Sequence, residues 1–356
     1  MPDGSTAAAP APGIVVVWSG AQPSVQVFRM PPAGLVIGRE LLQATSDDRI
    51  SRQHARVVWK ERRFAVTDLG SRNGTYVGGH ALVDREVTVT PPSVVRTGRT
   101  VSVLLDDVRK FEGATVEVRH DAIIGASTHL VWRQVEQLAQ AGTNLVILGE
   151  PGSGKARMAR GYAQVRGKPE AVFNPTIQAV PMDRVVGPKI ETVILEEVGK
   201  LSAANQAQLA KIIETRPNVR FVTTAVLALE HVGLPAGVVA RLSGALIAMP
   251  PLRDRPDEMA HLVHDAVRAA EPGLQIHSTL IEAALLRPWP GNSRELVAEV
   301  SRAAHTVASQ GKNNIRGEDL DNDAGHLMIG APTLNAAVTP TSVDKRKREP
   351  SGPHRG

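Results

Sequence analysis

A glycine-rich loop between an apolar run and a helix-forming segment is the feature that most limits what this chain can fold into. Residues 145–148 are all apolar, residues 149–155 read Gly-Glu-Pro-Gly-Ser-Gly-Lys, and residues 155–165 suit a helix. In such a loop the backbone N–H groups cradle phosphates, and the lysine reaches the β- and γ-phosphates. The pattern predicts a parallel α/β core that binds a nucleotide. Its candidate binding residues are Gly149, Gly152, Ser153, Gly154, Lys155 and Ala156.

The first part of the chain has a different pattern. Many short apolar or β-branched runs without helical periodicity predict an all-β sandwich. These runs are 14–18, 25–28, 34–37, 55–59, 63–68, 87–89 and 100–105, with Gly, Pro, Asp, Asn and Ser between them. Helical periodicity begins near residue 121, and helices are expected at 130–141, 257–270, 278–287 and 293–309.

The fold class is therefore multidomain: an all-β sandwich, then an α/β P-loop core with a small helical lid. We expect a disordered leader at 1–12, the sandwich at 13–108, a linker at 109–121, the core at 122–256 and the lid at 257–320. A disordered basic tail is expected at 321–356, because that stretch is rich in Pro, Thr and Ala and contains Lys-Arg-Lys-Arg at 345–348.

Composition excludes several classes of protein. The chain has no cysteine, so it has no disulfide framework and no thiolate metal site. No apolar run approaches the ~20 residues that a membrane helix needs. The N-terminus lacks the pattern of a signal peptide, so a cytoplasmic location is the default expectation. The net charge of +5 is small for this length and gives little reason to expect nucleic-acid binding.

Three clusters in the sandwich region suit phosphate binding. They are Gly38-Arg39, residues 51–54 (Ser-Arg-Gln-His) and residues 71–75 (Ser-Arg-Asn-Gly-Thr), each at the end of an expected strand. A dianionic phosphate needs charge-assisted donors from several directions, which two guanidinium groups and a serine hydroxyl can supply. Turn chemistry alone also favours Ser and Asn in loops, but it does not explain the ordered combination.

These clusters resemble the pattern of the forkhead-associated (FHA) family over about 95 residues. The resemblance implies that a phosphothreonine-containing protein, in a Ser/Thr kinase pathway, is the partner. It gives structural roles to Gly38, His54 and Gly74, and it lets Gly78-Gly79 replace the usual Asn-Gly of a hairpin turn. The implied phosphopeptide-binding residues are Arg39, Ser51, Arg52, Arg72 and Asn73.

The second part resembles the AAA+ domains of bacterial sigma-54 activators over about residues 120–310. Five segments agree in order: IIGAS at 123–127, GEPGSGK at 149–155, TVILEEVGKL at 192–201, PPLRDRPDE at 250–258 and WPGNSREL at 289–296. Ala156 stands where most P-loops have a Mg²⁺-binding hydroxyl, but these relatives lack it too. The resemblance implies ATP and Mg²⁺ as cofactors.

The same resemblance implies roles for four further residues. Glu196 takes the Walker B position that holds the metal, and Glu197 takes the position of the carboxylate that polarises the attacking water. Arg294 matches the sensor arginine at the γ-phosphate. Arg241 matches an arginine finger given to a neighbouring subunit, which implies a homo-oligomer. Taken singly, an acidic pair at a strand end or an exposed arginine is more often only a solvated surface group.

Several parts of the family pattern are missing. The second arginine-finger position is Pro235, and the sensor strand ends in Ala-Val where relatives have Thr-Asn. The stretch from Asn174 to Thr192 is too short for the loop with which relatives engage the sigma factor. Because no helix-turn-helix pattern follows residue 321, we expect no sequence-specific DNA binding.

Three functions remain open from the sequence. The first is a phosphothreonine-dependent signalling protein whose AAA+ domain binds ATP and hydrolyses it poorly. The second is an active ATPase that regulates sigma-54-dependent transcription. The third is a structural adaptor that binds no nucleotide, against which the intact glycine-rich loop argues.

Overall fold

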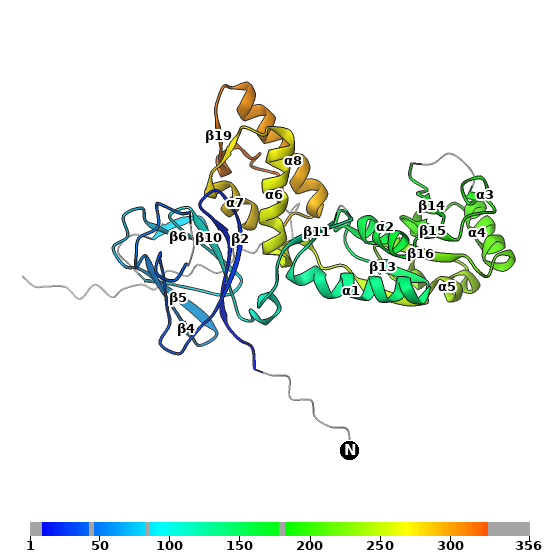
Figure 1. Cartoon of the computed structure of the whole chain (residues 1–356), viewed down its shortest axis with the longest axis horizontal. Coiled ribbons are helices and arrows are strands. Elements are labelled where there is room, and N and C mark those ends of the chain that lie inside the picture. Colours follow the sequence, from blue (N-terminus) through cyan, green and yellow to red (C-terminus); the bar gives the residue numbers. More distant parts are fainter. Residues whose placement is uncertain (1–8, 43–45, 83–85, 121, 178–181, 327–356) are drawn as a thin grey trace, which may run out of the picture.

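The computed structural model describes residues 9–42, 46–82, 86–120, 122–177 and 182–326. Figure 1 shows three units: a β-sandwich, an α/β unit at the other end of the molecule, and a group of helices that stands against the sandwich. The expected leader falls largely on residues 1–8 and the expected tail largely on 327–356, which lie outside the described residues. Within the described residues, no helix combines the length and the apolarity that crossing a membrane requires.

Two antiparallel sheets form the sandwich, as the sequence predicts. The six-stranded sheet has the order β2-β1-β10-β9-β6-β7 and the four-stranded sheet the order β3-β4-β5-β8. The strands are β1 (Gly13–Ser19), β2 (Gln22–Arg29), β3 (Leu35–Ile37), β4 (Ala55–Lys60), β5 (Arg63–Asp68), β6 (Thr75–Val77), β7 (His80–Leu82), β8 (Glu86–Val89), β9 (Ser93–Thr97) and β10 (Thr100–Leu105). The sequence predicts the longer strands but not β6, β7 and β9.

Strand β1 is buried along its whole length because both of its faces are covered. Ile14 and Val16 face the interior of the sandwich, where they join Phe64 of the opposite sheet. Val15 and Val17 point to the other face and belong to a second apolar core that the sandwich shares with the helices. The run of consecutive apolar residues in β1 is therefore explained by two cores, one on each face.

The turn between β6 and β7 has the form that the sequence predicts. Val77 and His80 are cross-strand partners, so Gly78 and Gly79 form a two-residue hairpin loop. Both glycines have positive φ angles of 59° and 83°. A hairpin turn of this kind requires positive φ at both central residues, which glycine adopts without steric cost.

A short connection leads from the sandwich to the α/β unit, whose five-stranded parallel sheet has the order β14-β15-β16-β13-β17. The glycine-rich loop follows the strand between β16 and β17. The connection holds η1 (Arg109–Phe111), β11 (Glu117–Arg119) and β12 (Ala122–Ile124). The unit comprises α1 (Ala126–Ala141), β13 (Leu145–Leu148), α2 (Lys155–Arg166), β14 (Glu170–Phe173), α3 (Met182–Val185), β15 (Thr192–Leu195), η2 (Val198–Lys200), α4 (Ala203–Thr215), β16 (Arg220–Ala225), η3 (Leu229–His231), α5 (Ala236–Leu242) and β17 (Ala245–Ala248).

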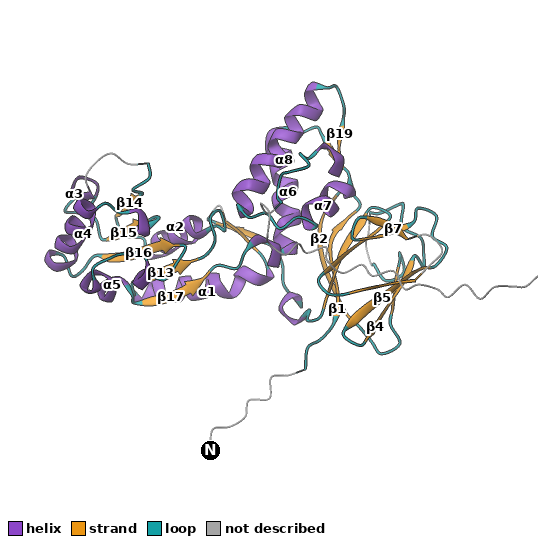
Figure 2. Cartoon of the chain, turned by 180° about the vertical axis from the view of Figure 1, so that it is seen from behind, coloured by secondary structure: helices purple, strands orange, loops and turns teal. Residues whose placement is uncertain are grey.

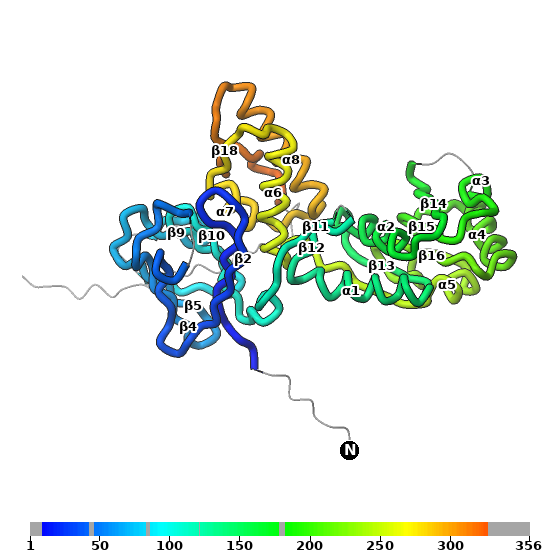
Figure 3. Tube along the Cα trace, in the orientation of Figure 1, coloured from blue at the N-terminus to red at the C-terminus, as the bar shows by residue number. Residues whose placement is uncertain are grey.

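The predicted helical lid follows, with the breaker Pro-Trp-Pro-Gly between its second and third helices. It consists of η4 (Leu252–Asp254), α6 (Pro256–Ala270), β18 (Gln275–Ile276), α7 (Ser278–Leu285), α8 (Asn292–Ser309), β19 (Asn314–Ile315) and η5 (Gly317–Asp319). Figures 2 and 3 show α6 and α7 beside the six-stranded sheet of the sandwich.

The lid and the sandwich share one apolar core. Trp18 and Val103 of the sandwich lie in the same buried cluster as Val263 of α6 and Ile281 of α7. The sequence patterns assign the lid to the α/β unit and do not indicate its contact with the sandwich. The lid helices therefore lie between the two other units, and one face of them packs against the sandwich.

Candidate phosphate-binding sites

The three clusters predicted to bind phosphate meet at one edge of the sandwich. Arg39 N donates to Ser51 O at 3.0 Å, which joins the first loop to the second. Arg72 N donates to Ser51 Oγ at 3.3 Å, and Asn73 Nδ2 donates to Arg49 O at 2.6 Å. Residues far apart in the sequence thus surround the Ser51 hydroxyl.

The guanidinium groups at this edge are available to a ligand. Arg39, Arg52 and Arg72 are all exposed. Arg39 Nη2 donates to Ile50 O at 2.9 Å, which directs its side chain toward Ser51. Within the described ranges, no hydrogen bond or ion pair involves the side chains of Arg52 and Arg72. The edge therefore presents arginine side chains that form no ion pair with the described residues.

Buried residues hold the loops in this arrangement. His54 is fully buried; its Nδ1 accepts from Ser51 N at 3.1 Å, and its Nε2 lies 3.0 Å from Gly74 O. A Cβ on Gly38 would lie 2.0 Å from Arg52 O, so the close approach of the two loops requires glycine there. Gly38, His54 and Gly74 have the structural roles that the FHA resemblance implies.

Two aspartates that the sequence patterns did not indicate also hold the loops in place through hydrogen bonds. Asp68 accepts from Ser71 Oγ and Thr75 Oγ1, both at 2.6 Å. Partial burial raises the pKa of Asp68, but its hydrogen bonds together lower the pKa by more. The pKa of Asp68 therefore lies below its ordinary value. Asp47, which is 2% exposed, accepts from Arg99 N at 2.8 Å. Each aspartate also accepts from the backbone N two residues further on, Arg49 N for Asp47 and Gly70 N for Asp68, and Asp in such a turn was the available signal.

The glycine-rich loop connects β13 to α2, as predicted. Lys155 begins the helix, is 5% exposed, and its Nζ donates to Gly149 O and Glu150 O at 2.9 Å each. Burial lowers the pKa of Lys155, and the charge of Arg294 lowers it further, while Glu197 and Glu150 raise it. The lysine thus lies in the field of two residues that the sequence assigns to the same site, Glu197 and Arg294.

The two predicted carboxylates lie in different surroundings. Glu197 follows β15, and its backbone N donates to Thr224 Oγ1 at 3.1 Å. Glu196 Oε2 instead accepts from Asn174 Nδ2 at 2.8 Å, and Glu196 Oε1 lies 3.6 Å from Arg160 Nη2. The described residues contain no group of three His, Cys, Asp or Glu that would hold a metal by itself.

The lid reaches directly onto the glycine-rich loop. Ser293 Oγ donates to Gly152 O at 2.7 Å, and Asn292 Nδ2 donates to Pro151 O at 3.0 Å. A Cβ on Gly152 would lie 2.0 Å from Gly291 O, so a side chain at residue 152 would separate the loop from the lid. The first turn of α8, which carries Arg294, is thereby fixed beside the loop.

A buried polar network that sequence reasoning missed also joins the loop to the lid. Arg255 Nη2 donates to Ser153 O, and Arg255 Nη1 donates to Glu258 Oε2, both at 3.1 Å. Glu258 accepts from Thr128 Oγ1 at 2.6 Å. Burial raises the pKa of Glu258 to about 7, although Arg255 opposes this. These residues lie in or beside segments quoted for the family resemblance, which was the available signal.

Arg241 is exposed on α5, and its side chain has no hydrogen bond or ion pair within the part of the chain that the structure describes. Only its backbone oxygen accepts, from Asn144 Nδ2 at 2.8 Å. Pro235 directly precedes the same helix. The two arginine-finger positions thus lie at the two ends of one short exposed helix.

Comparisons with known proteins agree with this division. The family model of the FHA domain matches residues 35–98 of this chain. The family model of the sigma-54 interaction domain matches residues 125–252. The chain carries both domains and is related to bacterial enhancer-binding proteins.

Curated relatives are transcriptional regulators. The hydrogenase transcriptional regulatory protein HoxA of Cupriavidus necator is 29% identical over 253 residues, 58% of this chain and 52% of the relative. The Nif-specific regulatory protein of Klebsiella pneumoniae is 31% identical over 180 residues, 44% of this chain and 34% of the relative. The chain thus spans about half or less of these relatives.

Solved structures are more distant. NtrX from Brucella abortus in complex with ADP has a TM-score of 0.49 and 17% identity, covering 60% of this chain and 57% of that chain. A structure from an analysis of phosphothreonine-dependent FHA domain interactions has a TM-score of 0.23 and 21% identity, covering 27% of this chain and 95% of that chain.

Proposed function

We propose that this chain recognises a phosphothreonine-containing protein through its sandwich and carries an ATP-binding AAA+ domain that hydrolyses ATP slowly or not at all. The observation that supports the first part best is that three loops, each with an exposed arginine, meet at Ser51. Arg39, Arg52 and Arg72 supply charge-assisted donors, Ser51 a hydroxyl and Asn73 an amide for the peptide backbone. The partner belongs to a Ser/Thr kinase pathway.

Titration of the full chain with matched phosphorylated and unphosphorylated threonine peptides tests the phosphopeptide proposal. Arg39→Ala should lose a charge-assisted bond worth roughly 1.5–3 kcal/mol, which is about a 10- to 150-fold loss of affinity. Arg63→Ala is the matched control, because the β4–β5 turn beside exposed Arg63 lies at the strand ends opposite to the candidate site. Equal affinity for both peptides would show that the sandwich does not read phosphate.

ATP binding is supported by the surroundings of Lys155. The glycine-rich loop offers backbone donors at the start of α2, and Glu197 and Arg294 act on the lysine charge. Glu196 and Glu197 are oxygen donors of the kind that Mg²⁺ prefers, and Mg²⁺ is often held by one or two carboxylates together with phosphate oxygens. The residues present therefore fit an ATP–Mg²⁺ complex, with Gly149, Gly152, Ser153, Gly154, Lys155 and Ala156 along the phosphates. When bound, the cation would offset negative charge on the phosphates.

Slow hydrolysis follows from what the arginine-finger helix lacks. Arg241 would serve a neighbouring copy in a homo-oligomer, and Glu197 would orient the attacking water. Pro235 cannot supply the second finger, and an arginine finger contributes on the order of 10³–10⁵ in rate. Nucleotide binding should be lost in Lys155→Ala and kept in Lys168→Ala, an exposed control beyond the same helix. Turnover at the rate of an ordinary AAA+ motor, abolished by Glu197→Gln, would contradict the proposal and favour the active ATPase.

Activation of sigma-54-dependent transcription is the second candidate function, because the curated relatives are transcriptional regulators. In the short stretch from Asn174 to Thr192, where relatives carry the sigma-engaging loop, residues 186 and 187 are bonded to the end of α4. Arg216 Nη1 donates to Val186 O at 3.2 Å and to Gly187 O at 3.0 Å, and α3 comprises only Met182–Val185. We therefore expect no activation in transcription assays with sigma-54 polymerase, ATP and a phosphothreonine peptide. Open complexes that depend on this chain and on Glu197 would support the alternative.

A further inference from the structure

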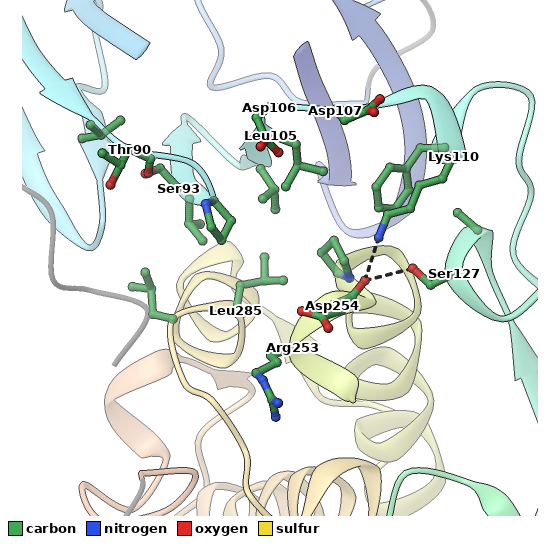
Figure 4. Close-up of a pocket in the computed structure, with 18 of the residues that line it drawn as sticks. Thr90, Ser93, Leu105, Asp106, Asp107, Lys110, Ser127, Arg253, Asp254 and Leu285 are labelled. Atoms are coloured by element: carbon green, nitrogen blue, oxygen red, sulfur yellow. Dashed lines mark hydrogen bonds between the residues drawn. The ribbon is translucent and has the colours of Figure 1, made fainter. Parts of the chain in front are cut away.

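A large groove lies where the sandwich, the connection, α1 and the lid meet. Its volume is about 1020 Å³, at the upper end of the ≈ 300–1,000 Å³ typical of ligand pockets. Figure 4 shows Leu105 of the sandwich, Lys110 of the connection, Ser127 of α1 and Leu285 of the lid around one space. The groove is separate from both phosphate sites, because none of their predicted residues lines it.

The groove wall is largely apolar and is open to solvent. Val89, Val94 and Leu105 line it from the sandwich, and Leu285 and Leu286 line it from the lid. Leu130 of α1, which also lines the groove, is 66% exposed. A soluble surface rarely leaves an apolar wall of this extent uncovered unless something binds there.

The polar groups at the groove are largely engaged with the protein. Lys110 Nζ and Ser127 Oγ both contact Asp254 O, at 3.3 and 2.9 Å, as Figure 4 shows. The carboxylate of Asp107 is paired with Arg109. Arg253 is turned toward Glu150, with 2.8 Å between Nη2 and Oε1. The carboxylates of Asp106 and Asp254 also line the groove, so the wall favours an occupant that is apolar and carries no negative charge.

The described chain ends beside this wall. Arg287, the neighbour of groove residue Leu286, donates to Ala324 O at 2.9 Å. Trp289 N donates to Gly325 O at 3.0 Å, and the Trp289 ring fills the space beside Gly325. His326 is the last described residue. The segment after His326 therefore starts close to groove residue Leu286.

The segment that follows has the composition that the groove requires. Residues 327–338 read Leu-Met-Ile-Gly-Ala-Pro-Thr-Leu-Asn-Ala-Ala-Val and contain no charged residue, whereas Lys-Arg-Lys-Arg follows at 345–348. An extended chain spans about 3.3 Å per residue, so this segment reaches roughly 40 Å from its starting point.

We propose that residues 327–338 of the same chain bind in this groove. The segment would then contact the sandwich, α1 and the lid together, and so hold the lid at one angle to the α/β unit. The lid connects to that unit through η4 beside the groove, where Arg253 and Asp254 line it. This proposal does not depend on phosphopeptide or nucleotide binding.

The absence of cysteine from the chain allows a direct test. In full-length Leu334→Cys protein labelled with acrylodan, we expect the blue-shifted emission of an apolar environment. Adding Leu130→Asp should return the emission to that of the label in water, because it places a charge on the groove wall. Adding Val118→Asp should leave the emission unchanged, since Val118 is 68% exposed and does not line the groove.

A second measurement changes the segment instead of the groove. Chymotrypsin cleavage after Leu327 or Leu334 should be slow in the full chain and faster by roughly tenfold in Ile329→Asp and in Leu130→Asp, because cleavage follows the population of the released segment. Water-like emission in labelled Leu334→Cys protein without a second substitution would overturn the proposal. So would an emission shift that grows with protein concentration, which would indicate a second copy, or one that Leu130→Asp leaves intact.

Discussion

Removing one partner of the buried ion pair between sandwich and lid should destabilise the chain strongly, whereas removing both should not. Arg96 Nε of β9 lies 2.6 Å from Glu282 Oε2 of α7, and the two side chains are 10% and 6% exposed. The Tyr76 ring lies 3.8 Å from the Arg96 guanidinium carbon. Among the described groups, no hydrogen-bond donor faces Glu282 Oε1. Arg96 is therefore the group that offsets the cost of burying the negative charge of Glu282.

The expected magnitudes follow from this burial. Arg96→Met leaves a carboxylate buried without its cation, which costs about 3–5 kcal/mol of unfolding free energy. Replacing both residues, as in Arg96→Met with Glu282→Leu, should cost less than about 1.5 kcal/mol or even stabilise the protein. The exposed pair of Arg29 in β2 with Glu112 of the connection is the control, because Arg29→Met there should change the unfolding free energy little.

The penalty in Arg96→Met should also depend on pH. Burial raises the pKa of Glu282 in the folded protein, and Arg96 lowers it, so removing Arg96 should raise it further. A folded-state pKa above the unfolded one means that stability is highest below the unfolded pKa and falls as pH rises through the folded pKa. The penalty should thus be smaller at pH 5 than at pH 7.5.

Urea unfolding followed by circular dichroism, for the parent, both single variants and the double variant, measures these differences. A cost below about 1 kcal/mol for Arg96→Met at pH 7.5, equal to the surface control, would refute the reasoning. A double variant as unstable as the sum of the single variants would do the same, since it would show that the two charges do not compensate each other.

Three further outcomes can be checked on the same protein. Gly38→Ala should lower the free energy of thermal unfolding by about 1–3 kcal/mol and abolish phosphopeptide binding, because the new Cβ would lie 2.0 Å from Arg52 O. The control is Gly187→Ala, whose Cβ would meet nothing within 4 Å. Asn73→Ala should weaken phosphopeptide binding by roughly tenfold in a titration, because one hydrogen bond of about 1.4 kcal/mol is lost. Glu258 has a folded pKa of about 7 against 4.5 in the unfolded chain, so its contribution to stability is full below pH 4.5 and is lost as pH rises through 7. Glu258→Gln should remove this fall of up to about 3 kcal/mol from urea unfolding curves, and an unchanged pH profile would contradict the assignment.

The sequence predicts the units of the fold better than their arrangement. The long strands of the sandwich, the Gly78-Gly79 turn and the lid helices lie where periodicity and turn residues place them. Strands β6, β7 and β9 were missed. Strands β6 and β7 have three residues each, which show too little alternation to be distinguished from a loop, whereas the equally short β3 is apolar throughout. Strand β9 follows directly after Pro91-Pro92, which is typical of a turn or loop.

The predicted site residues are positioned by neighbours that a single sequence does not reveal. Pattern and resemblance indicate Arg39, Ser51 and Asn73, but they do not indicate that Asp47 and Asp68 hold the loops. Likewise, the glycine-rich loop indicates Lys155, while the contact of Arg255 with Ser153 O depends on the packing of α6 against the loop. Long-range hydrogen bonds of this kind follow from tertiary packing, which local sequence does not encode.

The position of the lid also limits how the two phosphate sites can influence each other. Strand β6 starts directly after Gly74 of the peptide-reading loop, and its Tyr76 is the cross-strand partner of Arg96. Arg96 contacts Glu282 of the lid, and Ser293 of the lid contacts Gly152 of the nucleotide loop. The sandwich strands pack on α6 and α7, whereas the connection reaches α1 through η1, through β12 and through the ion pair of Arg119 with Glu136. Under the proposed function, the lid is thus one route by which peptide and nucleotide binding would be coupled, and the coupling free energy would be equal in both directions.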